Sequence, residues 1–104
     1  MDKSKLFENR LPTAEYELEG FGTLKFRSLT RDEAIKIGEV DDIGDRERKM
    51  LAWAMVDPKL SYQDAQKWQN ASPPNEIESV TEAIARVSGL LEESAKEATK
   101  SDTD

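Results

Sequence analysis

Polar and apolar residues alternate along two short segments near the start of the chain. Residues 15–19 read Glu-Tyr-Glu-Leu-Glu, and residues 23–27 read Thr-Leu-Lys-Phe-Arg. Alternation with a period of two is typical of a strand that buries one face. The intervening Gly20-Phe21-Gly22 can adopt the positive φ angles of a tight three-residue connection. The pattern therefore predicts a β-hairpin over residues 14–28.

Folding this hairpin about Phe21 predicts its register. The cross-strand pairs would be Leu18–Leu24, Tyr16–Phe26, Glu17–Lys25 and Glu15–Arg27. One face is then apolar, and because a lone hairpin is only marginally stable in water, we expect helices to cover that face. The two outer edges would be unpaired, and a homo-oligomer could form by strand pairing there.

Four helices are predicted downstream of the hairpin. Thr30 with Glu33, and Ser61 with Asp64, have the spacing of capping boxes. The run Met50–Val56 is apolar on all sides, which is typical of a helix surrounded by others, and Pro58 favours a helix end at Asp57. The predicted helices span about residues 31–40, 46–56, 62–71 and 75–93, with an acidic loop at 41–45.

These elements predict an α+β fold in which a small N-terminal β-hairpin packs on a bundle of about four helices. The length of 104 residues suits one domain, which we place at residues 13–91. Residues 1–12 would form a flexible, charged lead. Residues 92–104 lack an apolar period, so we expect a frayed or disordered acidic tail.

Composition narrows the function. The chain has no cysteine and no histidine, which argues against disulfides, thiolate nucleophiles, zinc fingers and imidazole catalysis. We expect neither an enzyme nor a metal or cofactor site. The net charge of -7 disfavours binding to nucleic acid or to an anionic membrane. The charged start and short apolar runs predict a cytoplasmic protein without a membrane span, so the expected partners are proteins.

Aromatic residues are the candidate binding residues. Trp68 and Tyr62 lie on an otherwise polar helix, where Trp68 either packs on the long helix or anchors an interface. Phe21 at the hairpin tip is either tucked in or exposed to a partner. We assign Trp53, within the apolar run, to the core. The many carboxylate pairs match a solvated acidic surface better than paired catalytic acids.

Three motifs follow one another along the chain. Residues 20–33 read Gly-Phe-Gly-Thr-Leu-Lys-Phe-Arg-Ser-Leu-Thr-Arg-Asp-Glu, residues 55–61 read Met-Val-Asp-Pro-Lys-Leu-Ser, and residues 87–90 read Val-Ser-Gly-Leu. In this order and spacing the chain resembles, over about residues 15–91, the tail assembly chaperones of long-tailed, siphovirus-like bacteriophages and prophages.

The resemblance implies a non-enzymatic assembly factor of the host bacterial cytoplasm that is absent from the finished virion. Such a protein binds the tape measure protein and keeps it soluble until tail tube subunits polymerise around it. In many members a ribosomal frameshift near the end of the short form appends a second domain, for which residues 92–104 would be a suitable junction. The longer form would bring in the tail tube protein as a further partner.

The physical mechanism we expect is shielding. Small acidic subunits would cover apolar helix faces of a long client while their mutual repulsion keeps the complex dispersed. We place the binding surface at an apolar groove near Trp68 and Tyr62, or at the hairpin edge. Two alternatives remain open: a structural tail or head completion protein retained in the particle, and an acidic DNA mimic that inhibits a DNA-binding protein.

Overall fold

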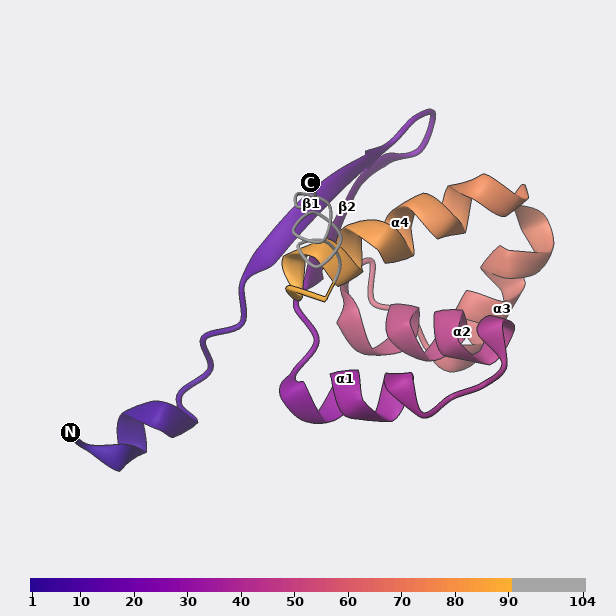
Figure 1. Cartoon of the computed structure of the whole chain (residues 1–104). Coiled ribbons are helices and arrows are strands. Elements are labelled where there is room, and N and C mark those ends of the chain that lie inside the picture. Colours follow the sequence, from indigo (N-terminus) through magenta and orange to yellow (C-terminus); the bar gives the residue numbers. More distant parts are fainter. Residues whose placement is uncertain (91–104) are drawn as a thin grey trace, which may run out of the picture.

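The computed structural model describes residues 1–90. The elements in chain order are the 3-10 helix η1 (Lys3–Phe7), β1 (Thr13–Leu18), β2 (Gly22–Arg27), α1 (Arg31–Gly38), α2 (Ile43–Ala54), β3 (Met55–Asp57), α3 (Tyr62–Ala71) and α4 (Pro74–Val87). Figure 1 shows the hairpin of β1 and β2 beside the four helices, which confirms the predicted α+β fold. The tail predicted at 92–104 lies outside the described residues.

The hairpin forms with a register that differs by two residues from the prediction. The observed pairs are Thr13–Arg27, Ala14–Phe26, Glu15–Lys25, Tyr16–Leu24, Glu17–Thr23 and Leu18–Gly22. The chain reverses about Gly20, which has a φ of 87°, and the N–H of Phe21 donates to the C=O of Leu18 (2.9 Å) to close the turn. Because strand faces alternate with a period of two, the shift leaves the apolar face and the charged face as predicted.

A third strand, which the sequence did not predict, pairs with β2. The helix expected over 46–56 ends at Ala54, and Met55–Asp57 forms β3, antiparallel to β2, so the strand order is β1-β2-β3. Met55 is 1% exposed and Val56 is 49% exposed. The gain from burying Met55 and pairing with β2 overrides the helical preference of the apolar run. One hairpin edge that we expected to be free is therefore partly paired.

The acidic stretch at 41–45 begins a helix, although we predicted a loop there. The Asp42 side chain accepts a hydrogen bond from the N–H of Asp45 (2.8 Å) and so caps α2, which begins at Ile43. The predicted start of α1 is confirmed, because Thr30 and Glu33 form a complete capping box. Helix α1 ends at Gly38, two residues before the predicted end.

The predicted bounds of α3 are confirmed, but α4 is shorter than expected. Helix α4 ends at Val87, whereas we predicted a helix to residue 93. Gly89 has a φ of 76°, and the N–H of Leu90 donates to the C=O of Ala85 (2.9 Å). The N–H of Gly89 donates to the C=O of Arg86 (3.0 Å), which completes a Schellman motif. Glycine thus ends the helix inside the Ser-Gly-Leu motif.

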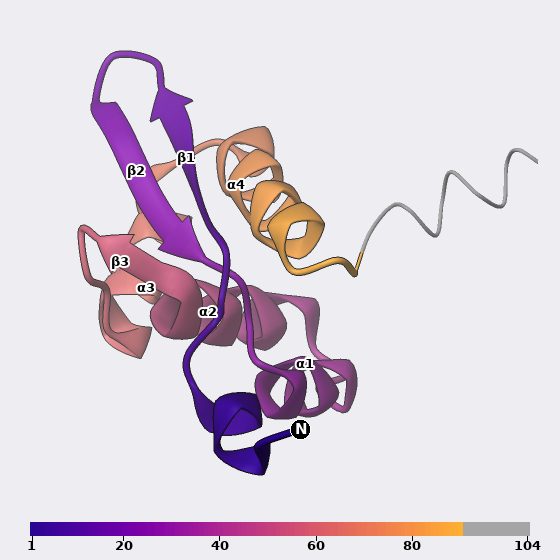
Figure 2. The same ribbon diagram turned by 90° about the vertical axis from the view of Figure 1, so that its left-hand side faces the viewer.

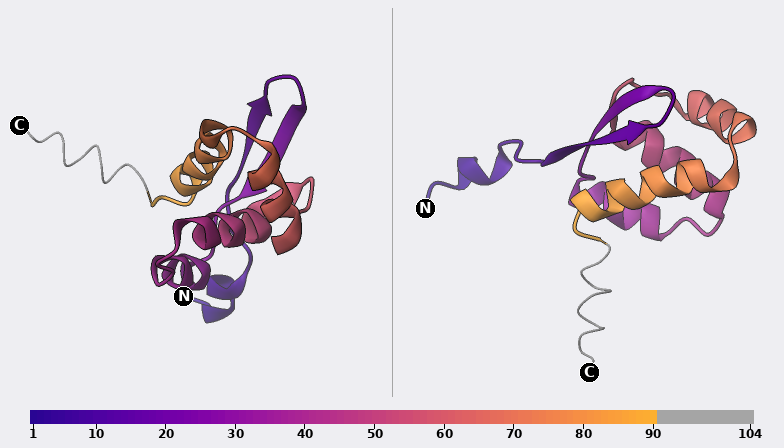
Figure 3. Two further views of the ribbon diagram at one scale, coloured as in Figure 1. Left: turned by 90° about the vertical axis from the view of Figure 1, so that its right-hand side faces the viewer. Right: turned by 90° about the horizontal axis from the view of Figure 1, so that it is seen from above.

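The helices gather on one side of the small sheet. Figure 2 shows α4 beside the hairpin and α2 and α3 below it. Glu15, Glu17 and Lys25 on the opposite face of the hairpin are exposed. Figure 1 and the right-hand view of Figure 3 show η1 projecting away from the helices, so the lead expected at residues 1–12 contains a short helix.

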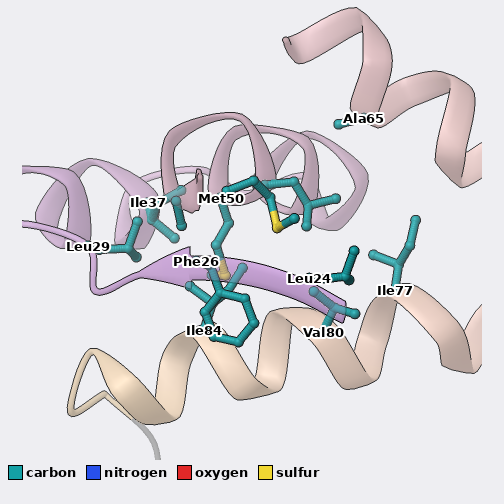
Figure 4. Close-up of a cluster of buried hydrophobic side chains, with 12 residues drawn as sticks. Leu24, Phe26, Leu29, Ile37, Met50, Ala65, Ile77, Val80 and Ile84 are labelled. Carbon is teal, nitrogen blue, oxygen red and sulfur yellow. The ribbon is translucent and has the colours of Figure 1, made fainter. Parts of the chain in front are cut away.

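The core lies where β2 meets the helices. Its buried hydrophobic residues are Leu24, Phe26, Leu29, Ile37, Met50, Leu51, Ala54, Met55, Ala65, Ile77, Val80 and Ile84. Figure 4 shows Phe26 next to Ile84, with β2 running between α2 and α4. Phe26 is 0% exposed. Trp53, which we predicted in the core, is half-buried and packs against this cluster.

Two phenylalanines of the hairpin give a matched test of this core. We expect Phe26→Ala to lower the free energy of unfolding by about 3–5 kcal/mol, because the substitution removes a buried ring and leaves a cavity. Phe21 is 80% exposed, so Phe21→Ala should change stability by less than about 0.5 kcal/mol. Urea unfolding followed by circular dichroism measures both values. Equal losses for the two variants would contradict this account of the core.

Candidate functional site

An apolar groove of about 550 Å³ lies between the tip half of the hairpin and the junction of α3 with α4. The lining residues are Leu18, Phe21, Gly22, Thr23, Leu24, Pro58, Leu60, Trp68, Ala71, Ser72, Pro73 and Glu76. The volume falls within the range of about 300–1,000 Å³ that is typical of ligand sites. The groove is large enough to receive several apolar side chains of a partner.

Phe21 stands at the mouth of this groove. Its backbone closes the hairpin turn, and its side chain is 80% exposed. Of the two interpretations offered by the sequence, the structure favours the exposed ring over the tucked one. A large exposed aromatic side chain beside an apolar hollow is typical of a protein contact surface.

Trp68 forms part of the groove wall and also packs on the molecule. Its ring is half-buried against the core, and its indole Nε1–H donates to Oε2 of Glu76 in the first turn of α4 (2.7 Å). The Ser72 hydroxyl donates to the C=O of Trp68 (2.8 Å) at the end of α3. The hydrogen bond to Glu76 and the packing on the core hold the ring in place where it lines the groove.

Tyr62 lies apart from the groove and belongs to a polar network that joins α2 to α3. Its hydroxyl donates to Oδ1 of Asp45 and accepts from Nε of Arg48 (3.0 Å). The Arg48 guanidinium also donates to Gln69 (2.7 Å), and its carbon lies 5.3 Å from the centre of the Tyr62 ring. The structure thus brings together Phe21 and Trp68 of the three candidate residues and assigns Tyr62 to helix packing.

Glu76 is the one charged residue of the groove lining. Glu17 accepts a hydrogen bond from the hydroxyl of Thr23 (2.7 Å) on the opposite, exposed face of the hairpin. Glu19 precedes the turn and is exposed. Lys59, next to Pro58, is an exposed basic neighbour. The groove therefore combines apolar walls with one acidic side chain, Glu76, and Lys59 follows the lining residue Pro58.

Sequence reasoning missed several groove residues. Leu60 and Pro73 were not among the candidate binding residues. Leu60 lines the groove from the connection between β3 and α3, and Pro73 lines it from the junction of α3 with α4. Since β3 was not predicted, its neighbours gave no signal in the sequence.

Within residues 1–90, no group of three or more acidic residues is arranged to hold a metal ion. None of the described helices combines the length and apolarity needed to cross a bilayer.

Comparisons with models of known protein families, with curated proteins and with solved structures gave no match. Residues of the motifs that carry the resemblance have structural roles in this fold. Gly20 forms the turn and Thr30 caps α1. Ser88 accepts a hydrogen bond from the N–H of Leu29 (2.9 Å) and so joins the end of α4 to the start of α1.

The Tyr62 network makes a prediction about pH. The hydrogen bond from Tyr62 lowers the pKa of Asp45, with further help from Lys49 and Arg48. A carboxyl group with a lowered folded pKa stabilises the fold above its unfolded pKa, and this contribution disappears as the pH falls through the folded pKa. Tyr62→Phe removes the donor, so we expect the pKa of Asp45 to rise towards its ordinary value. The difference in free energy of unfolding between the two proteins should then become smaller in acid.

Carboxyl-carbon NMR titration of the two proteins measures this change. Asp64 is the internal control, because its pKa is lowered by the backbone N–H and the hydroxyl group of Ser61 and should stay where it is. An unchanged Asp45 titration in Tyr62→Phe would contradict the assigned hydrogen bond.

Proposed function

We propose that this protein is a non-enzymatic tail assembly chaperone that binds the tape measure protein in the host bacterial cytoplasm and keeps it soluble during tail tube assembly. The observation that carries the proposal is the apolar groove with Phe21, 80% exposed, at its mouth. Apolar surface of this kind on a small acidic protein supports binding of an apolar protein segment. The order of motifs in the sequence supports the choice of client.

The proposed mechanism is local shielding by many copies. A groove of about 550 Å³ covers a few side chains, whereas a tape measure protein is long, so successive segments each take one copy. Binding to exposed apolar segments opposes their self-association by mass action. The net charge of -7 on each copy then makes the complexes repel one another. The longer frameshifted form would connect this complex to the tail tube protein.

Ion pairing weakens the DNA-mimic alternative. Glu33 pairs with Arg27 (2.8 Å), Asp32 with Lys36 (3.0 Å) and Asp45 with Lys49 (3.2 Å). A DNA mimic presents rows of carboxylates without compensating cations, as phosphates stand along a duplex. The acidic residues named here are instead matched to basic neighbours.

Co-expression with the tape measure protein tests the proposal. We expect the client to become soluble and to co-elute with this chain on size exclusion. Phe21→Ser should lower the co-eluting client at least about fivefold, because it removes the exposed anchor of the groove while leaving the core intact. Ile43→Ser is the matched control, since Ile43 is an apolar side chain that is 67% exposed and lies outside the groove lining.

Two outcomes would contradict the proposal in different ways. A client that stays insoluble with this chain and with the longer form would reject the chaperone function. Equal client recovery with Phe21→Ser and Ile43→Ser would reject the groove as the binding site. Detection of the protein in purified virions would favour the structural completion protein instead.

A further inference from the structure

The edge of β2 that borders the groove is paired along only half of its length. Strand β3 pairs with β2 through Lys25–Asp57 and Phe26–Met55 and ends at Asp57. Pro58 has no N–H to donate, and the chain then leaves the sheet towards α3. Residues 22–24 of β2 therefore have no strand on this side within the described part of the chain.

Thr23 presents its backbone groups to this gap. The N–H of Ser28 donates to the C=O of Pro12 (2.8 Å), which marks that pair as a hydrogen-bonded one. Since hydrogen-bonded and non-hydrogen-bonded pairs alternate in an antiparallel ladder, the Glu17–Thr23 pair is non-hydrogen-bonded. The N–H and C=O of Thr23 thus point away from β1, and no hydrogen bond to either is found in residues 1–90.

The same position lines the apolar groove. Gly22 and Thr23 form one side of the groove, and Trp68, Leu60 and Pro73 lie among its other lining residues. The groove thus offers apolar contacts and a free pair of backbone hydrogen-bonding groups together. A helix uses its own N–H and C=O groups internally, whereas an extended segment can pair with a strand edge and place alternate side chains in a pocket.

We propose that the groove binds the client in an extended conformation, as a short added strand that pairs with β2 at Thr23 on the side already used by β3. This inference rests on the proposed function for the identity of the client. The inference specifies the conformation of the bound client. The added strand would continue an edge of β2 that already pairs with β3. A client segment that is held extended cannot form a helix, so it cannot associate with another client through helix pairing.

Charge complementarity defines the segment further. Glu76 lies in the groove wall, where one of its carboxylate oxygens accepts a hydrogen bond from the indole N–H of Trp68. Lys59 is the basic neighbour at the Pro58 end. The segment that fits alternates apolar residues with polar ones and carries a lysine or arginine that reaches Glu76.

Amide hydrogen exchange at Thr23 tests the added strand. The probe is the tape measure fragment that co-purifies with this chain, bound to the ¹⁵N-labelled full chain and followed by NMR. We expect exchange of the Thr23 amide to slow at least about tenfold on binding, because a new hydrogen bond must open first. The Glu15 amide points out from the opposite edge of the sheet, on β1, and its exchange rate should stay unchanged.

The conformation of the client is read in the same complex. Cα chemical shifts of the labelled fragment should be those of an extended chain at the residues that contact Phe21 and Trp68. Helical chemical shifts at those residues would contradict the added strand. So would a Thr23 amide that stays in fast exchange while the NMR signals of Phe21 and Trp68 shift on binding. Either result would still allow the groove to be the binding site. Protection of Glu15 without Thr23 would also overturn the added strand. Failure of any fragment to co-purify would instead count against the proposed function.

A charge variant tests the basic side chain of the segment. Glu76→Gln keeps an oxygen for the indole N–H of Trp68 and removes the charge. We expect it to weaken fragment binding about fivefold in low salt and to reduce the salt dependence of binding. Glu82→Gln is the control, because Glu82 lies on the same helix and pairs with Arg86, outside the groove lining. Equal affinities for the two variants would reject the contact with Glu76.

Discussion

Strand β2 is covered on one face, paired along the whole of one edge and paired along half of the other, and the other elements are arranged around it. Phe26, near the end of the strand, is 0% exposed between the sheet and the helices. Strand β1 pairs along the whole of β2, and β3 pairs with its second half. A hairpin alone would leave Phe26 in water and would be marginally stable. The hairpin and the helices therefore stabilise each other through the core that they share.

Several contacts hold the chain where it leaves β2 and enters α1. Arg27 at the end of the strand forms a two-point ion pair with Glu33 (2.8 and 3.1 Å), and Glu33 also completes the cap of α1. This contact lowers the pKa of Glu33, chiefly through the hydrogen bond from Arg27. Ser88, which is distant in sequence, accepts a hydrogen bond from the N–H of Leu29 in the same connection. Strand, helix start and the end of α4 are thus joined at one place.

The groove exists because β3 is short. After Asp57 a proline ends the ladder and Leu60 leads into α3, so the tip half of β2 has helices near it and no third strand beside it. Trp68, oriented by Glu76, forms one wall, and Phe21 stands at the opening. A longer β3 would fill the same space and remove both the apolar hollow and the free edge at Thr23.

Local signals in the sequence determined the class of fold, the hairpin faces and the best-capped helix starts. Thr30 with Glu33, and Ser61 with Asp64, predict their helices because a capping box depends on residues within one turn. Alternation predicts which hairpin residues face the core, because it has the period of the strand itself. The aromatic residues Phe21 and Trp68 were also predicted from the sequence as candidate binding residues.

Tertiary structure decided the rest, since it depends on contacts between residues distant in sequence. Met55–Asp57 has the apolar pattern of a helix and becomes a strand because β2 offers it a partner and the core takes Met55. Tyr62 looked like a partner of Trp68 on one helix, but packing of α2 against α3 turns it to Asp45 and Arg48. The groove is made by β2, α3, α4 and the connection after β3 together, so only the folded chain defines its walls.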